Sequence, residues 1–195
     1  MNTEGPTLTT TPTPNLAPNL APAPAPVPAT ALALVTAPAS AHPTPRIRRT
    51  HIALFVKDPY ASAPWYEDVL GMQVTARGPQ WVFLSFGRKH HDIALIRAEP
   101  GADGAHTRGT VNLQHYGLEI EGDVDELRRL YGMLLAKKVP VVKTTDHAVG
   151  LGVYFTDPDG HRFEFFCETV HDDAEGQRIL GLLGAPSTPI ELQPL

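Results

Sequence analysis

The sequence predicts an α+β fold built from two β-α-β-β-β modules, with candidate metal ligands on the inner face of its strands. Two observations predict it. The first is an internal repeat: His51 begins the segment HIALFV and His115 begins the similar segment HYGLEI, 64 residues later. The second is that each segment precedes one helix-like stretch and three strand-like stretches. We expect one domain over residues 46–170, with modules at about 47–100 and 110–170.

Composition narrows the function classes. The chain has 195 residues, of which 42% are hydrophobic, enough for one buried core. Its formal net charge of -5 offers no basic surface for nucleic acid. Its one cysteine, Cys167, excludes an internal disulfide and a cysteine-based zinc site, and we expect a cytoplasmic protein. No apolar run is long enough to span a membrane, so we expect no membrane partner.

Two appendages flank the domain. Residues 1–45 are mostly Pro, Ala and Thr, and this composition predicts a disordered arm with polyproline II character. An export signal is the alternative for ATALALVT and APASA, but that stretch is short and no Lys or Arg precedes it. Residues 171–195 form a C-terminal tail, in which we expect one short helix.

The helix of the first module is predicted in SAPWYEDVLG. Ser62 is the expected N-cap, Pro64 lies in the first turn and Gly71 follows the end. Three strands are expected after it, in MQVTA, WVFLSFG and HDIALIRA.

The helix of the second module is predicted in DVDELRRLYGMLLAKK. Asp123 is the expected cap, with Glu126 three residues later as in a capping box. Strands are expected in VPVVKT, GLGVYFT and HRFEFFCE, and the turn TDPDGH joins the last two through Asp-Gly.

Strand alternation places three candidate metal ligands. His51 alternates with aliphatic residues that belong under the helix, so His51 faces the inside of the sheet. The same alternation places His115 on the inner face of its strand. In the last strand the more apolar Phe163 and Phe165 face the helix, so Glu164 lies on the inner face. All three are then expected to face one cavity. Taken singly, each reads as an ordinary strand histidine or surface carboxylate. Together they form the two-histidine, one-carboxylate set that suits Fe(II), with Mn(II) as the alternative, and leaves open coordination positions.

The repeat, these positions and the ending YFTDPDGHRFEFF resemble the vicinal oxygen chelate superfamily over about residues 47–168. This superfamily includes glyoxalase I, bleomycin- and fosfomycin-resistance proteins and type I extradiol dioxygenases. The resemblance implies its fold, in which the paired β-α-β-β-β modules form an open, curved mixed sheet around a metal site. The repeat predicts two ligand positions in each module, four in all. Aligning HDIAL with HRFEF places Ala94 at the position that Glu164 has in the second module, so the fourth ligand position has no ligand side chain. Glyoxalase I typically fills four positions, whereas a ring-cleaving dioxygenase needs room for both catechol oxygens and O2. The chain is therefore most similar to single-domain, catechol 2,3-dioxygenase-like members.

The resemblance also implies three catalytic residues. HDIALI is similar to the family strand that carries an acid-base histidine, which assigns that role to His91. DHAVGLGVYFTDPDG is similar to the run that carries a hydrogen-bond donor and an active-site tyrosine, which assigns those roles to His147 and Tyr154. The alternatives are a strand-edge residue for His91, a surface loop residue for His147 and a plain core residue for Tyr154.

The resemblance thus implies an Fe(II)-dependent extradiol dioxygenase of aromatic catabolism, with a catechol-type aromatic and O2 as substrates and a homodimer as its assembly. Three alternatives stay open: another metal-dependent member, glyoxalase-like or a thiol transferase; a non-catalytic ligand-binding module; and a scaffold acting through the Pro-rich arm. The sequence does not identify the catechol, because pocket shape selects ring substituents.

Overall fold

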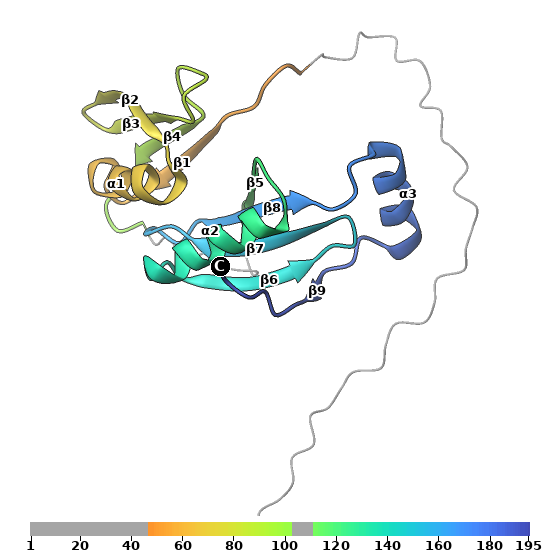
Figure 1. The fold of residues 1–195 in the computed structure, drawn as a ribbon. Helices are drawn as coiled ribbons and strands as arrows, with labels where there is room; N and C mark the ends of the chain where they lie inside the picture. Colours follow the sequence, from red (N-terminus) through yellow and green to blue (C-terminus); the bar gives the residue numbers. More distant parts are fainter. Residues whose placement is uncertain (1–46, 103–110) are drawn as a thin grey trace, which may run out of the picture. The chain divides into compact units, whose positions relative to one another are not determined.

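The computed structural model describes residues 47–102 and 111–195, and residues 47–195 form one compact unit (Figure 1). The expectations for the arm at 1–45 lie outside the described residues. None of the helices within the described ranges has the length and apolar character that a membrane crossing requires.

Each expected module is present, with its elements in the expected order. The first consists of β1 (Ile52–Val56), α1 (Pro59–Leu70), β2 (Gln73–Gly78), β3 (Trp81–Ser85) and β4 (Ile93–Arg97). The second consists of β5 (Tyr116–Glu119), α2 (Val124–Ala136), β6 (Val141–Asp146), β7 (Gly150–Thr156) and β8 (Arg162–Glu168). The tail adds α3 (Asp173–Leu183), the short helix expected there, and the two-residue strand β9 (Thr188–Pro189).

The strands form two mixed sheets. Their orders are β1-β4-β3-β2 and β5-β8-β7-β6-β9. In each module the first and last strands pair in parallel and the remaining pairs are antiparallel. The α+β class with two β-α-β-β-β modules is confirmed. The strands form two open sheets, each of which contains parallel and antiparallel pairs.

Strand registers support the internal repeat. Ala53 pairs with Ala94 in the first sheet, and Gly117 pairs with Glu164 in the second. Because residues 53 and 117 are equivalent in the repeat, Ala94 occupies the place of Glu164 in the first module. A methyl group offers no ligand atom there, as the sequence alignment predicts.

The start of α1 differs from the expectation. Asp58, and not Ser62, is the N-cap: its carboxylate accepts a hydrogen bond from Tyr60 N at 2.9 Å, and Pro59 follows as the first helical residue. Ser62 lies inside the helix, where its hydroxyl donates to Asp159 Oδ2 at 2.6 Å. The prediction failed because this long-range bond uses the side-chain oxygen that was read as a cap. Gly71 ends the helix in the left-handed conformation, φ 65°, as expected.

Helix α1 joins the two modules. It packs on β3 and β4 of its own sheet, and Trp65 and Tyr66 make ring contacts with Phe163 of β8. The Tyr66 hydroxyl donates to Asp157 Oδ2 at 2.5 Å. The two aspartates of the DPDG turn, Asp157 and Asp159, are 4% and 7% exposed and receive these bonds from the first module. The turn is therefore a structural joint as well as a hairpin connection.

Candidate functional site

His115 and Glu164 meet on the second sheet. His115 immediately precedes β5, and Glu164 lies on β8, which pairs in parallel with β5. Phe163 and Phe165 point into the core, so the alternation of the strand turns Glu164 to the opposite face. There His115 Nε2 lies 3.0 Å from Glu164 Oε2, and the carboxylate is only 6% exposed. Two potential ligand atoms are thus adjacent.

His147 and Tyr154 lie beside the same carboxylate. His147 Nε2 is 3.6 Å from Glu164 Oε1 and 3.1 Å from the Tyr154 hydroxyl oxygen. Burial, a hydrogen bond to Glu164 and the charge of that carboxylate raise the pKa of Tyr154 far above its usual value of 10.0. The hydroxyl therefore keeps its proton and serves as a hydrogen-bond donor at neutral pH.

Gly152 makes room for Glu164. On the neighbouring strand β7, a Cβ atom at residue 152 would lie 2.2 Å from Glu164 Oε1. The sequence alone does not reveal this role of Gly152, because the closeness of the two strands is not visible in it. Sequence reasoning also missed Lys143, whose Nζ lies 4.3 Å from the centre of the Tyr154 ring.

His51 and His91 lie together on the first module. His51 immediately precedes β1 and is exposed, and its ring meets that of His91 edge-on at 5.0 Å between centroids. The His91 ring also stacks on Phe83 at 4.4 Å. Burial and the neighbouring charges of His90, His51 and Arg49 lower the pKa of His91 from its usual value of 6.5. A neutral His91 ring is therefore favoured at neutral pH, where it can accept a proton.

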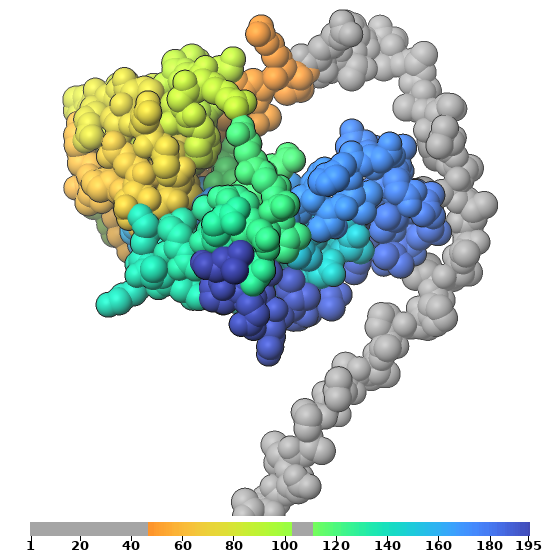
Figure 2. All heavy atoms as spheres, in the orientation of Figure 1, coloured from red at the N-terminus to blue at the C-terminus, as the bar shows by residue number. Residues whose placement is uncertain are grey.

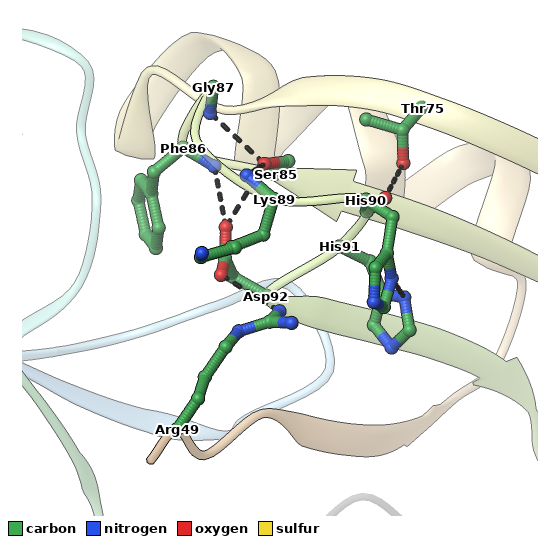
Figure 3. A network of polar contacts seen from close by, with 9 residues as sticks. All are labelled: Arg49, Thr75, Ser85, Phe86, Gly87, Lys89, His90, His91 and Asp92. Carbon is green, nitrogen blue, oxygen red and sulfur yellow. Dashed lines mark hydrogen bonds and ion pairs between the residues drawn. The ribbon is translucent and has the colours of Figure 1, made fainter.

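A polar network fixes the turn that presents His91. Asp92, the next residue, accepts hydrogen bonds from Ser85 Oγ at 3.1 Å and from Phe86 N at 3.0 Å, and pairs with Arg49 at 3.1 Å (Figure 3). His90 and His91 project from the same turn, with their Nδ1 atoms 2.7 Å apart. The turn is thus tied both to β3 and to the segment that leads into β1.

The structure divides the six predicted site residues into two groups. His115, Glu164, His147 and Tyr154 are together on the second module, whereas His51 and His91 are together on the first. Among the described residues, no three His, Cys, Asp or Glu side chains are placed to hold one metal ion. The structure brings His115 and Glu164 together, and a single metal site that also includes His51 stays a prediction.

A separate hollow lies away from these residues. A cavity of about 850 Å³ lies between the modules on the side of α2, with Leu118, Ile120 and Phe165 in its apolar lining. Its lining contains none of the six predicted site residues. The predicted site residues therefore lie outside this cavity.

Comparison with known proteins identifies the family. Residues 48–165 match the model of the Glyoxalase/Bleomycin resistance protein/Dioxygenase superfamily. The chain belongs to this superfamily. The recognition made from the YFTDPDGHRFEFF ending and the repeat is thereby confirmed, as is the paired-module fold. A domain of the same superfamily from Frankia sp. EAN1pec aligns over 64% of this chain and 99% of its own, with a TM-score of 0.53 and 21% identity.

Members of the superfamily with assigned activities differ from one another. Biphenyl-2,3-diol 1,2-dioxygenase 3 of Rhodococcus globerulus is 33% identical over 124 residues, which cover 62% of each chain. Metallothiol transferase FosB of Lysinibacillus sphaericus (strain C3-41) is 25% identical over 124 residues, which cover 63% of this chain and 83% of the transferase. The match thus spans about three fifths of the dioxygenase, and the superfamily alone does not select the reaction.

Proposed function

We propose that this protein is an Fe(II)-dependent extradiol dioxygenase that opens a catechol-type ring next to its two hydroxylated carbons. The observation that carries the proposal is the convergence of His115, His147 and Tyr154 on the buried carboxylate of Glu164. The similarity to a dioxygenase of biphenyl-2,3-diol supports it. In this reaction both atoms of O2 enter the ring-opened product, a semialdehyde. Mn(II) is the alternative metal, and a cytoplasmic location remains part of the proposal.

The side chains of the second module have distinct roles in this proposal. His115 and Glu164 supply an imidazole nitrogen and a carboxylate oxygen, which are ligand types that suit iron. The metal would supply a common binding point for substrate and O2. Tyr154, which keeps its proton, is the hydroxyl donor of this group, and His147 Nε2 lies 3.1 Å from its oxygen. Glu164 is almost wholly buried, so little water reaches its carboxylate.

The expected homodimer provides the remaining residues. His51 and His91 lie on the face of the first sheet that α1 does not cover, where Phe55 is 71% exposed. In our proposal the first module of one protomer faces the second module of its partner. Because a two-fold interface is self-complementary, it would build two equal sites. His51 would then be the third ligand, and the neutral ring of His91 would take the first catechol proton.

Metal analysis combined with an activity assay tests the function. The protein is purified without oxygen, its bound metals are determined, and catechol or a substituted catechol is added with O2. We expect iron near one per chain and a yellow ring-cleavage product. Bound Mn, Zn or Ni with indifference to O2 would contradict the proposal.

A metallothiol transferase is the second candidate. Its specific support is that the match covers 83% of the length of the FosB relative, more than of the dioxygenase. The two candidates differ in co-substrate: a transferase consumes a thiol and an electrophilic small molecule, whereas a dioxygenase consumes O2. Oxygen uptake on catechol addition, measured with an electrode, therefore separates them.

A further inference from the structure

The last residues of the chain form a strap over the second sheet. We define the C-terminal strap as residues 184–195, which follow α3. It begins at Gly184 and Ala185, both in the left-handed region at φ 70° and 52°. Through β9 the strap pairs antiparallel with β6, with Thr188 opposite Asp146. Ile190 N donates to Thr144 O at 3.2 Å, and the Thr144 hydroxyl donates to Ile190 O. The strap thus extends the sheet at its edge.

The far end of the strap is anchored on α2. Arg128 Nε donates to Gln193 O at 2.8 Å, and Leu195 N donates to Arg128 O at 3.2 Å. A Cβ atom at Gly132 would lie 2.5 Å from Leu195 O, so the glycine allows this close approach. In Figure 2 the last residues, in dark blue, lie against the green and teal surface of α2. The strap is therefore held at both ends.

Between these anchors the strap touches the candidate site. Pro186 O lies 2.9 Å from His147 Nδ1. A carbonyl oxygen can only accept a hydrogen bond, so Nδ1 must carry the hydrogen. In the neutral ring Nε2 then has a free lone pair, and Nε2 is the atom that lies 3.1 Å from the Tyr154 hydroxyl. The contact therefore selects both the tautomer and the direction of the ring.

The backbone of His147 is fixed separately. His147 N donates to Gly150 O at 2.9 Å, and Ala148 N donates to Asp146 Oδ1 at 2.6 Å. These bonds hold the turn between β6 and β7, but they leave the imidazole ring free to rotate about its side-chain bonds. Within the described residues, the bond at Nδ1 to Pro186 O holds the ring at the nitrogen other than the one that faces Glu164.

We propose that the C-terminal strap is a positioning element, in which the Pro186 carbonyl holds His147 as the Nδ1-protonated tautomer with Nε2 toward Tyr154 and Glu164. The ring is oriented by a segment nearly forty residues away in sequence. The effect of this orientation on turnover rests on the proposed function, whereas the tautomer itself does not.

Nitrogen NMR of the imidazole rings tests the tautomer. Protonated and unprotonated ring nitrogens have well-separated ¹⁵N shifts, and a His147→Gln variant identifies the signals of His147. Three proteins are compared with the full chain. Deletion of residues 185–195 removes Pro186, and the Thr144→Val/Ser187→Ala double variant loosens the strap but keeps it. Deletion of residues 191–195 is the matched control, because it removes the α2 contacts and retains Pro186 and β9.

We expect a protonated Nδ1 in the full chain and in the control. Deletion of 185–195 should shift His147 toward the Nε2-protonated form that predominates in free histidine, and the double variant should give a mixture. If the longer deletion does not fold, as judged by circular dichroism, the double variant decides. An unchanged Nδ1-protonated signal in the folded long deletion, or in the double variant when it decides, would overturn the proposal.

Catechol turnover separates this proposal from the proposed function. Loss of an orienting hydrogen-bond partner typically lowers activity about 10- to 100-fold, and we expect a loss of that order in kcat for the long deletion. The control should retain the activity of the full chain. If the full chain does not act on catechols but the tautomer shifts as expected, the dioxygenase assignment fails and the positioning role of the strap stands.

Discussion

Gly152 and Glu164 lie so close across β7 and β8 that a Cβ atom at residue 152 would come within 2.2 Å of Glu164 Oε1. The atom it would meet is the end of a flexible side chain and not backbone. A methyl group at this position would therefore move the carboxylate and leave the strands in place. The orientation of the carboxylate thus depends on the absence of one side chain from the neighbouring strand.

The first prediction follows from this contact. Gly152→Ala should displace the Glu164 carboxylate from His115 and weaken metal binding about 10- to 100-fold, the range found when the support of a ligand is lost. Metal affinity is measured by titration of the metal-free protein, and thermal unfolding confirms that the fold remains.

Gly117→Ala is the matched control. Its Cβ atom would lie 3.7 Å from Glu164 Oε2, an ordinary contact, and 3.3 Å from the Phe166 ring, which would have to shift by a few tenths of an ångström. We expect metal affinity near that of the unmodified protein. Equal affinity in both alanine variants would contradict the role assigned to Gly152.

The second prediction concerns the division of the site between protomers. His51→Ala and Glu164→Ala should each be inactive alone. In a mixed dimer, one site contains both changes and the other contains neither. After random exchange of subunits, half the dimers are mixed, so activity should return to roughly a quarter of the unmodified value.

A control mixture fixes the interpretation of that assay. His115→Ala and Glu164→Ala both alter the second module, so their mixture should stay inactive because each site keeps one defect. Recovery confined to the first mixture is the expected result. No recovery in either mixture, or a monomer by light scattering, would contradict the shared site.

The sequence predicts the faces of the strands well because alternation is local. His51 and Phe55 are exposed while Leu54 and Val56 are buried, as the period of two requires. The same count turns Glu164 away from the core. The repeat also predicts which residues of the two modules are equivalent. The strand registers agree, because they place Ala94 of the first module where the second module has Glu164.

Long-range contacts limit what the sequence predicts. Serine is a common helix N-cap, but the Ser62 hydroxyl donates instead to Asp159, which lies 97 residues away in the sequence. Alternation also states only which face His51 occupies. It does not state that His51 of the first module and His115 of the second module point to the same place. Gly152 and Pro186 act through neighbours in space, so no local pattern reveals them.

The third prediction tests the joint between the modules. Tyr66 is fully buried, and its hydroxyl donates to Asp157, whose side chain has no solvent exposure. Tyr66→Phe leaves a buried carboxylate short of one donor, which should lower the free energy of unfolding by about 1.5–3 kcal/mol. Tyr60→Phe is the control, because the Tyr60 hydroxyl bonds to Gly78 O at an exposed position. Denaturant unfolding measures both, and equal losses would contradict the joint.

The fourth prediction is a dependence of stability on pH at the same turn. Burial acts to lower the pKa of His161, but its hydrogen bond to Asp157 and the charges of Asp157 and Asp159 outweigh this and raise the pKa above its usual value of 6.5. A raised pKa in the folded state means that the charged form stabilises the fold. This contribution is complete below pH 6.5 and is lost as the pH rises through the raised value.

His161→Gln removes the charge but keeps a polar side chain at the turn. The variant should melt a few degrees below the unmodified protein at pH 5.5, because there the charged pair with Asp157 is complete. At pH 8.5 the gap should narrow, since the histidine has lost its charge. His171→Gln, which makes the same substitution in the segment that precedes α3, serves as the control. A gap for His161→Gln that widens as the pH rises would contradict the sign of the shift, because a lowered pKa would then be required.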